Sequence, residues 1–216
     1  MATKPSNERR EELISVYREM CDTHECPLKD VRTRVVFGAG NADADVMFVG
    51  EAPGAAEDLQ GLPFVGRAGK LLDELLAEVG IQRSDVFITN VICCRPPGNR
   101  DPLPDEIESC KPYLYRKIEL IEPKIICTLG NFATKLLTGN PTGITKVHGR
   151  PQEREIADRL VLLFPIFHPA AALRTESVKQ LLRDDFAKLP ELLAQQAERE
   201  EEEAPDGEAD QLGLFQ

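Results

Sequence analysis

Three residues in this 216-residue sequence have the side chains and positions that a reactive site requires. Glu51 lies in the turn Gly50-Glu51-Ala52-Pro53-Gly54, and Asn90 and His168 each stand at the end of an apolar run. A carboxylate can orient water or stabilise positive charge, a carboxamide both donates and accepts, and an imidazole can donate to developing negative charge. Gly50 permits close approach of the backbone to a ligand. These residues are the first set of candidates.

The six cysteines are the second set. The N-terminal segment is polar and lacks the apolar core of a signal peptide, and no run of about 18 apolar residues occurs, so neither secretion nor membrane insertion is expected. We therefore expect a cytoplasmic, nucleoid-associated protein with reduced thiols, in which metal or cluster ligation is the leading use of cysteine. The cysteines are Cys21, Cys26, Cys93, Cys94, Cys110 and Cys127.

The elements that position both sets follow from the hydrophobic pattern. Short apolar runs rich in β-branched and aromatic residues predict buried strands, and segments with helical spacing lie between them. This alternation predicts parallel β-α-β units, whose ligands bind beyond the carboxyl ends of the strands. Four loops, including Gly130-Asn131, should therefore converge on one crevice, unless these Gly, Pro and Asn residues only end strands and cap helices. The predicted strands are 46–49, 86–91, 125–129 and 160–167, and the predicted helices are 7–20, 68–79, 104–121 and 131–137.

The net charge of −11 is unusual for a protein that binds a polyanion, but it is unevenly distributed. The segment from Glu198 to Gln216 holds eight acids and one arginine, which leaves 29 acids against 25 bases elsewhere. A like-charged segment with few apolar residues cannot offset its chain entropy by burial. We therefore predict a single folded domain over residues 1–197 and a disordered acidic tail over 198–216.

Three longer motifs carry a resemblance to a known family. They are the segment 50–58, the segment 61–69 around Phe64, and His168-Pro169-Ala170-Ala171-Ala172-Leu173-Arg174. Together they resemble the uracil-DNA glycosylase superfamily, specifically its iron-sulfur class called family four, over residues 26–174. The resemblance implies a three-layer α/β/α fold with a central four-stranded, mainly parallel sheet. It also implies a monomeric enzyme that hydrolyses the N-glycosidic bond of uracil in DNA and leaves an abasic site for base excision repair.

The resemblance assigns a role to each candidate. The loop holding Gly50 and Glu51 helps to place the hydrolytic water and bind the flipped nucleotide, Phe64 stacks on uracil, Asn90 reads its pairing edge, and His168 stabilises the departing base. Taken alone, each residue has an ordinary structural alternative: a helix-capping acid, a core aromatic, a turn asparagine or a satisfied histidine.

Three further residues extend this assignment. Glu57 is a candidate catalytic helper beside the sugar. Leu173 or Arg174 could contact DNA and fill the gap that the extruded nucleotide leaves in the duplex. No lysine in these loops is placed as a Schiff-base nucleophile, so cleavage of the DNA strand is not expected.

Family members hold a four-iron four-sulfur (4Fe-4S) cluster with a C-x2-C pair near the N-terminus and two later cysteines. Cys26, Cys94 and Cys110 match three of these positions. The fourth position holds Thr23, with Cys21 two residues earlier. The cluster that the resemblance implies therefore needs a ligand from elsewhere.

We predict Cys21 as that ligand, because C-x4-C spacing occurs in plant-type ferredoxins, provided that the helix ends before it. His24 is the competing ligand and zinc the competing metal. Cys93 and Cys127 lie in apolar runs and are expected to be buried small hydrophobes. The cluster is expected to be structural, with redox sensing as the alternative.

The end of the chain resembles the short peptide with which bacterial proteins dock on the sliding clamp. The residues are Gln211-Leu212-Gly213-Leu214-Phe215, and the alternative is an apolar end that folds back on the body. On an acidic tether such a peptide would concentrate an enzyme at the replication fork.

Two other functions remain open from the sequence. A module that binds uracil-containing DNA without catalysis, with a redox-sensing cluster, would share the same motifs. A phosphate-ester hydrolase is disfavoured, because the sequence lacks the phosphate-cradling Gly-x4-Gly-Lys-Ser/Thr motif.

Overall fold

The four predicted apolar runs form the parallel centre of one sheet. The computed structural model describes residues 6–203. Its sheet has the strand order β1-β3-β2-β4-β6-β5, and the four central strands run parallel. These strands are β2 (Val46–Gly50), β3 (Phe87–Asn90), β4 (Ile125–Leu129) and β6 (Arg159–Ile166). The predicted strands and their parallel arrangement are therefore confirmed.

Two edge strands enlarge the sheet beyond the predicted four. The strands β1 (Ala39–Gly40) and β5 (Gln152–Ile156) pair antiparallel with β3 and β6, respectively. The pattern missed β1 because it has only two residues, and β5 because exposed and half-buried polar residues alternate along it. An edge strand that faces solvent has no need of the apolar run that marks a buried one.

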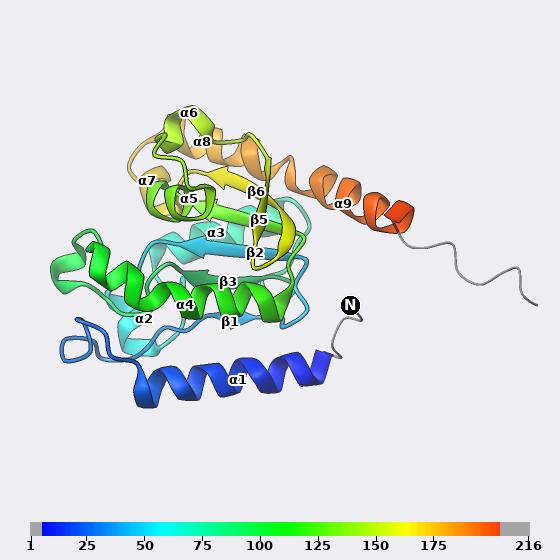
Figure 1. Cartoon of the computed structure of the whole chain (residues 1–216). Coiled ribbons are helices and arrows are strands. Elements are labelled where there is room, and N and C mark those ends of the chain that lie inside the picture. Colours follow the sequence, from blue (N-terminus) through cyan, green and yellow to red (C-terminus); the bar gives the residue numbers. More distant parts are fainter. Residues whose placement is uncertain (1–5, 204–216) are drawn as a thin grey trace, which may run out of the picture.

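Helices cover both faces of the sheet, so the predicted three-layer arrangement is confirmed (Figure 1). Because neighbouring residues of a strand point to opposite faces, Met47 and Val49 enter one apolar core while Val46 and Phe48 enter the other. The first core lies under α1 (Ser6–Thr23), α4 (Pro104–Ile121) and α5 (Asn131–Thr138). The second lies under α3 (Arg67–Glu78), α8 (Glu176–Phe186) and α9 (Leu189–Glu203).

The last helix corrects the predicted start of the tail. α9 continues to Glu203, so the segment 198–203 is helical and not a disordered tail. Glu and Arg favour helix, and two ion pairs tie this end to the sheet: Arg199 with Glu153, and Glu200 with Lys124 at 2.8 Å. The clamp-like peptide 211–215 lies outside the described residues.

Short elements connect the larger ones at the carboxyl end of the sheet. They are α2 (Ala55–Gln60), the 3-10 turn η1 (Pro97–Asn99), α6 (Ile144–Val147) and α7 (Pro169–Ala172). Among residues 6–203, no helix combines the length and apolar character needed to cross a membrane.

Candidate active site and metal centre

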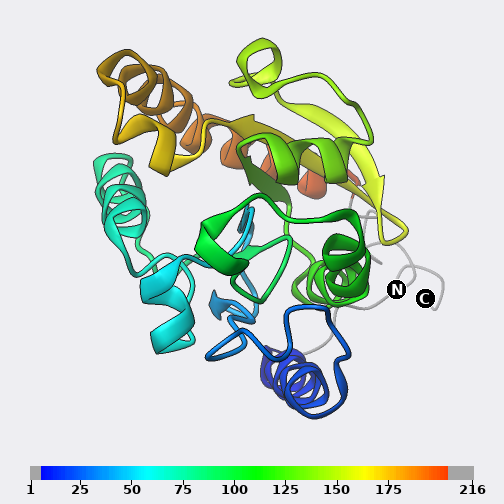
Figure 2. The ribbon, with the colours of Figure 1, turned by 90° about the vertical axis from the view of Figure 1, so that its left-hand side faces the viewer.

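A cavity of about 260 Å³ lies beyond the carboxyl ends of the parallel strands. The ribbon in Figure 2 is viewed from the left-hand side of Figure 1. This volume is near the lower end for ligand pockets, about 300 Å³, and suits a single base. Its lining includes Glu51, Phe64, Asn90 and His168, which the sequence singled out separately. The fold thus brings together residues that are up to 117 positions apart in the chain.

Asn90 lines the cavity and pairs with Gly50 of the neighbouring strand β2. The Asn90 side chain is buried, and its Oδ1 has no hydrogen-bond partner within residues 6–203. A Cβ atom on Gly50 would lie 2.4 Å from this oxygen and 2.8 Å from the Phe64 ring, so only glycine leaves the space open. A buried acceptor without a partner is costly, so this oxygen is available to an N–H group that enters the cavity.

Phe64 is held in the cavity wall by a strained backbone. Its φ of 51° is unfavourable for a bulky residue, and such strain concentrates at functional sites. Gly69 on α3 allows the chain to pass close by, because a Cβ there would lie 1.8 Å from the Phe64 carbonyl oxygen. The Phe64 ring stacks near the His168 ring, with 5.6 Å between the centroids. The sequence analysis did not identify the role of Gly69.

His168 is held in its neutral form with a defined tautomer. It precedes α7, and its Nδ1 accepts a hydrogen bond from the Ala170 N–H at 3.1 Å. Since Nδ1 accepts, the proton lies on Nε2. Burial lowers the pKa of His168 to about 4, against the opposing effect of the Glu57 charge. His168 can therefore donate from Nε2 as a neutral imidazole at physiological pH.

The carboxyl group of Glu51 has a pKa near neutral pH. It is half-buried in the cavity wall, and burial together with the negative charge of Asp101 raises its pKa to about 7. A group that titrates near the working pH can both hold and release a proton, which is the property of a general base or acid.

The Glu57 carboxylate accepts hydrogen bonds from the backbone of a neighbouring loop. Its Oε1 accepts hydrogen bonds from the Val65 and Gly66 N–H groups at 3.0 and 2.8 Å, just before α3 begins. This carboxylate therefore holds the loop that carries Phe64. Glu57 also lines the cavity, and its second oxygen, Oε2, takes no part in these two hydrogen bonds.

The rim of the cavity differs in two ways from the sequence prediction. Arg174 lines it, whereas Leu173 lies at the end of α7 with 38% of its surface exposed. The loop after β4 is not part of the lining. Instead, Gly130 lies behind the His168 side chain, and Asn131 accepts a hydrogen bond from the Ile144 N–H.

The proline-rich loop over residues 95–104 supplies lining residues that the sequence analysis did not assign. Pro96, Asn99 and Arg100 all reach the cavity. Arg100 donates to the buried Glu106 carboxylate at 2.5 and 2.9 Å, which fastens the loop to the start of α4. The prolines in the sequence indicate a stiff loop. They do not show that the Arg100–Glu106 pair fastens it beside the cavity.

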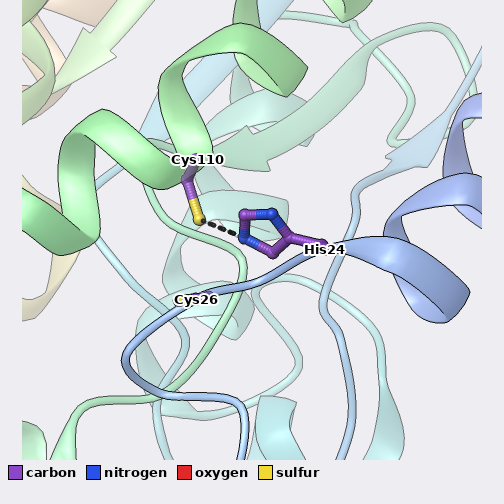
Figure 3. A group of neighbouring side chains, drawn as sticks. All are labelled: His24, Cys26 and Cys110. Carbon is purple, nitrogen blue, oxygen red and sulfur yellow. Dashed lines mark hydrogen bonds between the residues drawn. The ribbon is translucent and has the colours of Figure 1, made fainter.

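A second group of side chains lies between the end of α1 and α4. Figure 3 shows His24, Cys26 and Cys110, whose ligand atoms all lie within 4.8 Å of one another. All three are buried, and the His24 Nε2 is 3.6 Å from the Cys110 Sγ. Cys94 adjoins the group, since hydrogen bonds with Cys110 and with Cys94 lower the pKa of Cys26.

Two cations lie beside these buried thiols. Arg32 donates to the Cys94 Sγ at 3.2 Å. Lys117 is fully buried, donates to the Phe37 carbonyl and the Thr89 hydroxyl at 2.8 and 2.7 Å, and lies 3.6 Å from the Cys93 Sγ. A nearby cation favours the thiolate, which is the form in which cysteine binds a metal. The donor set of thiols and an imidazole thus fits an iron-sulfur cluster or a zinc ion.

Cys21, the predicted fourth ligand, is not brought into this group. α1 continues to Thr23 instead of ending before Cys21, so Cys21 is exposed on the last turn and hydrogen-bonded to Tyr17. The Thr23 hydroxyl donates to the Glu19 carbonyl at 2.8 Å, which extends the helix. His24, the competing ligand, occupies the inner position.

The two remaining cysteines are both buried, as expected. Cys127 lies on β4 and packs in the second apolar core, and burial alone raises its pKa. Cys93 is more than a small hydrophobe, because a hydrogen bond with Cys110 and the nearby Lys117 charge lower its pKa to about 6.

Comparison with known proteins identifies a family match over most of the chain. The model of the Uracil DNA glycosylase superfamily matches residues 37–190. A Type-4 uracil-DNA glycosylase of Sulfurisphaera tokodaii is 46% identical over 185 residues, covering 83% of this chain and 84% of the relative. One of Archaeoglobus fulgidus is 45% identical over 186 residues, covering 84% and 94%, and one of Thermotoga maritima is 44% identical over 183 residues, covering 83% and 94%.

Proposed function

Because the chain belongs to the uracil-DNA glycosylase superfamily, we propose that it excises uracil from DNA. It hydrolyses the N-glycosidic bond and leaves an abasic site for base excision repair. The observation that carries this proposal is the buried, unpaired Oδ1 of Asn90 in the lining of a base-sized cavity. The N3–H of uracil would satisfy that oxygen, whereas N3 of cytosine carries no proton.

The other cavity residues have complementary roles in the proposed reaction. The nucleotide is flipped out of the DNA, at a cost of a few kcal/mol, and its base enters the cavity against Phe64. As the bond breaks, negative charge develops on uracil O2 and is stabilised by the Nε2–H of His168. Positive charge develops on the sugar, where ionised Glu51 stabilises it and orients the attacking water.

We further propose that the chain holds a 4Fe-4S cluster through Cys26, Cys94, Cys110 and a fourth ligand. Its role would be structural. Cys94 and Cys110 bracket the loop that contributes Asn99 and Arg100 to the cavity, so metal ligation at both ends would hold the loop in place.

Proposals for partners concern the surface and the tail. Arg174, on the rim, and Leu173, on the adjacent exposed surface, would contact DNA around the flipped nucleotide. The peptide 211–215 would dock on a sliding clamp. We propose a monomer that acts in the cytoplasm on nucleoid DNA.

The test of the proposed function is release of free uracil. The protein is incubated with oligonucleotides that carry one U, one T or one C at the same position, and both the free base and alkali-sensitive cleavage are measured. We expect release from the U substrate alone. Binding of the U oligonucleotide by the metal-loaded protein, without release of base, would instead identify a binding module.

The pKa of Glu51 predicts the pH dependence of this activity. Because the ionised carboxylate is the active form and its pKa is about 7, kcat/KM should rise with pH through an acidic limb near 7. Asp101→Asn removes a like charge, so the pKa falls and the limb moves to lower pH. Burial, the larger cause, remains in this variant, so only part of the shift is lost.

The measurement is a profile of kcat/KM against pH for the wild type, Asp101→Asn and a control, Asp184→Asn, whose carboxyl group is exposed on α8. The control should keep the wild-type limb. The proposed role of Glu51 would be refuted by a wild-type limb near 4.5, or by an unchanged limb in Asp101→Asn.

A further inference from the structure

We propose that His24 is the fourth ligand of the cluster, so that three cysteines and one histidine hold it. This inference rests on the presence of the proposed cluster. The sequence places Thr23 where the C-x2-C pair would have its first cysteine, and the neighbouring residue is a histidine. The structure turns that histidine inward, towards Cys26 and Cys110 (Figure 3).

His24 is buried with its ring nitrogen directed at the thiols, as a metal ligand would be. Only 4% of its surface is exposed, and its Nε2 points at the Cys110 Sγ from 3.6 Å. Its ring and the ring of Tyr113 form a T-shaped pair, with 4.8 Å between the centroids and 77° between the planes. This contact fixes the plane of the imidazole, so that Nε2 faces the thiols.

Cys21 does not compete from its observed position. It lies in the last turn of α1 with its thiol on the exposed side, beside Tyr17 one turn earlier. To reach Cys26, the last turn would have to unwind and lose the hydrogen bond from Thr23 to the Glu19 carbonyl. His24 follows directly after the helix and needs no such rearrangement.

A histidine ligand changes the charge of the centre. A neutral imidazole in place of a thiolate removes one negative charge, and histidine ligation raises the reduction potential of iron-sulfur centres. Arg32, which donates to the Cys94 Sγ, adds positive charge beside one ligand sulfur whichever residue is the fourth ligand, so the difference comes from the histidine alone. The centre should therefore be easier to reduce than one with four cysteines in the same site.

The experiment detects the nitrogen bound to the cluster. The intact protein is purified without oxygen, with either natural or ¹⁵N-labelled histidine, then reduced and studied by pulsed EPR. Iron, sulfide and zinc are measured on the same samples. The variants are His24→Cys, Cys21→Ala and, as a matched control at another histidine, His148→Asn.

We expect a directly bound nitrogen whose coupling changes with ¹⁵N-histidine in the wild type, Cys21→Ala and His148→Asn. His24→Cys should keep iron and sulfide, lose the coupling and show a more negative reduction potential. Absence of the coupling in the wild type, or its persistence in His24→Cys, would overturn the inference. The wild-type spectrum decides the question even if His24→Cys does not load with iron.

The same samples separate this inference from the proposals on which it rests. Zinc in place of iron and sulfide would refute both the cluster and its histidine ligand, and leave the glycosylase proposal untouched. Release of uracil by an iron-loaded protein without nitrogen coupling would refute the histidine ligand alone. Loss of uracil release with the coupling present would refute only the proposed activity.

Discussion

His168→Ala is expected to lower the rate of uracil release under single-turnover conditions on the order of 10²- to 10³-fold, the effect of removing one donor from a developing anion. The donor is the Nε2–H, because Nδ1 accepts from the Ala170 N–H. This contact strengthens as charge moves onto uracil, so binding of the U oligonucleotide should change little. The measurement is the single-turnover rate constant beside the Kd for the same substrate.

His168→Asn separates the two tasks of this side chain. Asparagine is a favoured helix N-cap, so it can still accept from the Ala170 N–H, but it is too short to donate to uracil from the position of Nε2. We expect this variant to keep the thermal stability of the wild type and to lose activity as the alanine variant does. Activity within about threefold of the wild type, less than 1 kcal/mol of barrier, would show that His168 only caps α7.

The neutral form of His168 also makes a prediction about pH. Since its pKa is about 4, the imidazole does not titrate between pH 5 and 8, where only the limb of Glu51 is expected. A second limb in this range that disappears in His168→Asn would contradict a neutral donor.

Asn90→Leu is expected to change activity and stability in opposite directions. Loss of the side chain leaves polar groups of uracil unpaired, which costs about 3 kcal/mol and lowers kcat/KM on the order of 10²-fold. In the free protein, however, the variant removes the buried Oδ1 that has no partner within the described residues. Its free energy of unfolding should therefore be equal to or higher than that of the wild type.

The measurements are kcat/KM on U and C oligonucleotides, whose ratio should fall in the variant, and urea unfolding without DNA. Asn140→Leu is the matched control, since Asn140 is exposed and accepts local hydrogen bonds from the Thr142 N–H and hydroxyl groups. It should leave the base selectivity unchanged. A large loss of stability in Asn90→Leu would mean that Asn90 supports the fold, and would contradict its role as an acceptor that gains a partner only when uracil binds.

Local sequence determined the central elements of this protein. The strands β2, β3, β4 and, after its first two residues, β6 are buried on both faces, so burial favoured mostly apolar residues and left a clear pattern. The same pattern placed Glu51, Asn90 and His168 at the carboxyl ends of three strands. Parallel strands end at one edge, and that is sufficient to bring these residues together.

Tertiary structure alone decided the finer assignments. Glu57 Oε1 accepts from two N–H groups that lie eight and nine residues further along the chain, and Gly69 matters because the start of α3 comes close to the Phe64 carbonyl. Residue types alone do not show these contacts, because both depend on the path of the loop that carries Phe64. The positions of Cys21 and His24 also depend on the folded structure. Spacing along a sequence does not show where a helix ends. An α-helix turns by about 100° per residue, so residues only three positions apart can face solvent, as Cys21 does, or the buried thiols, as His24 does.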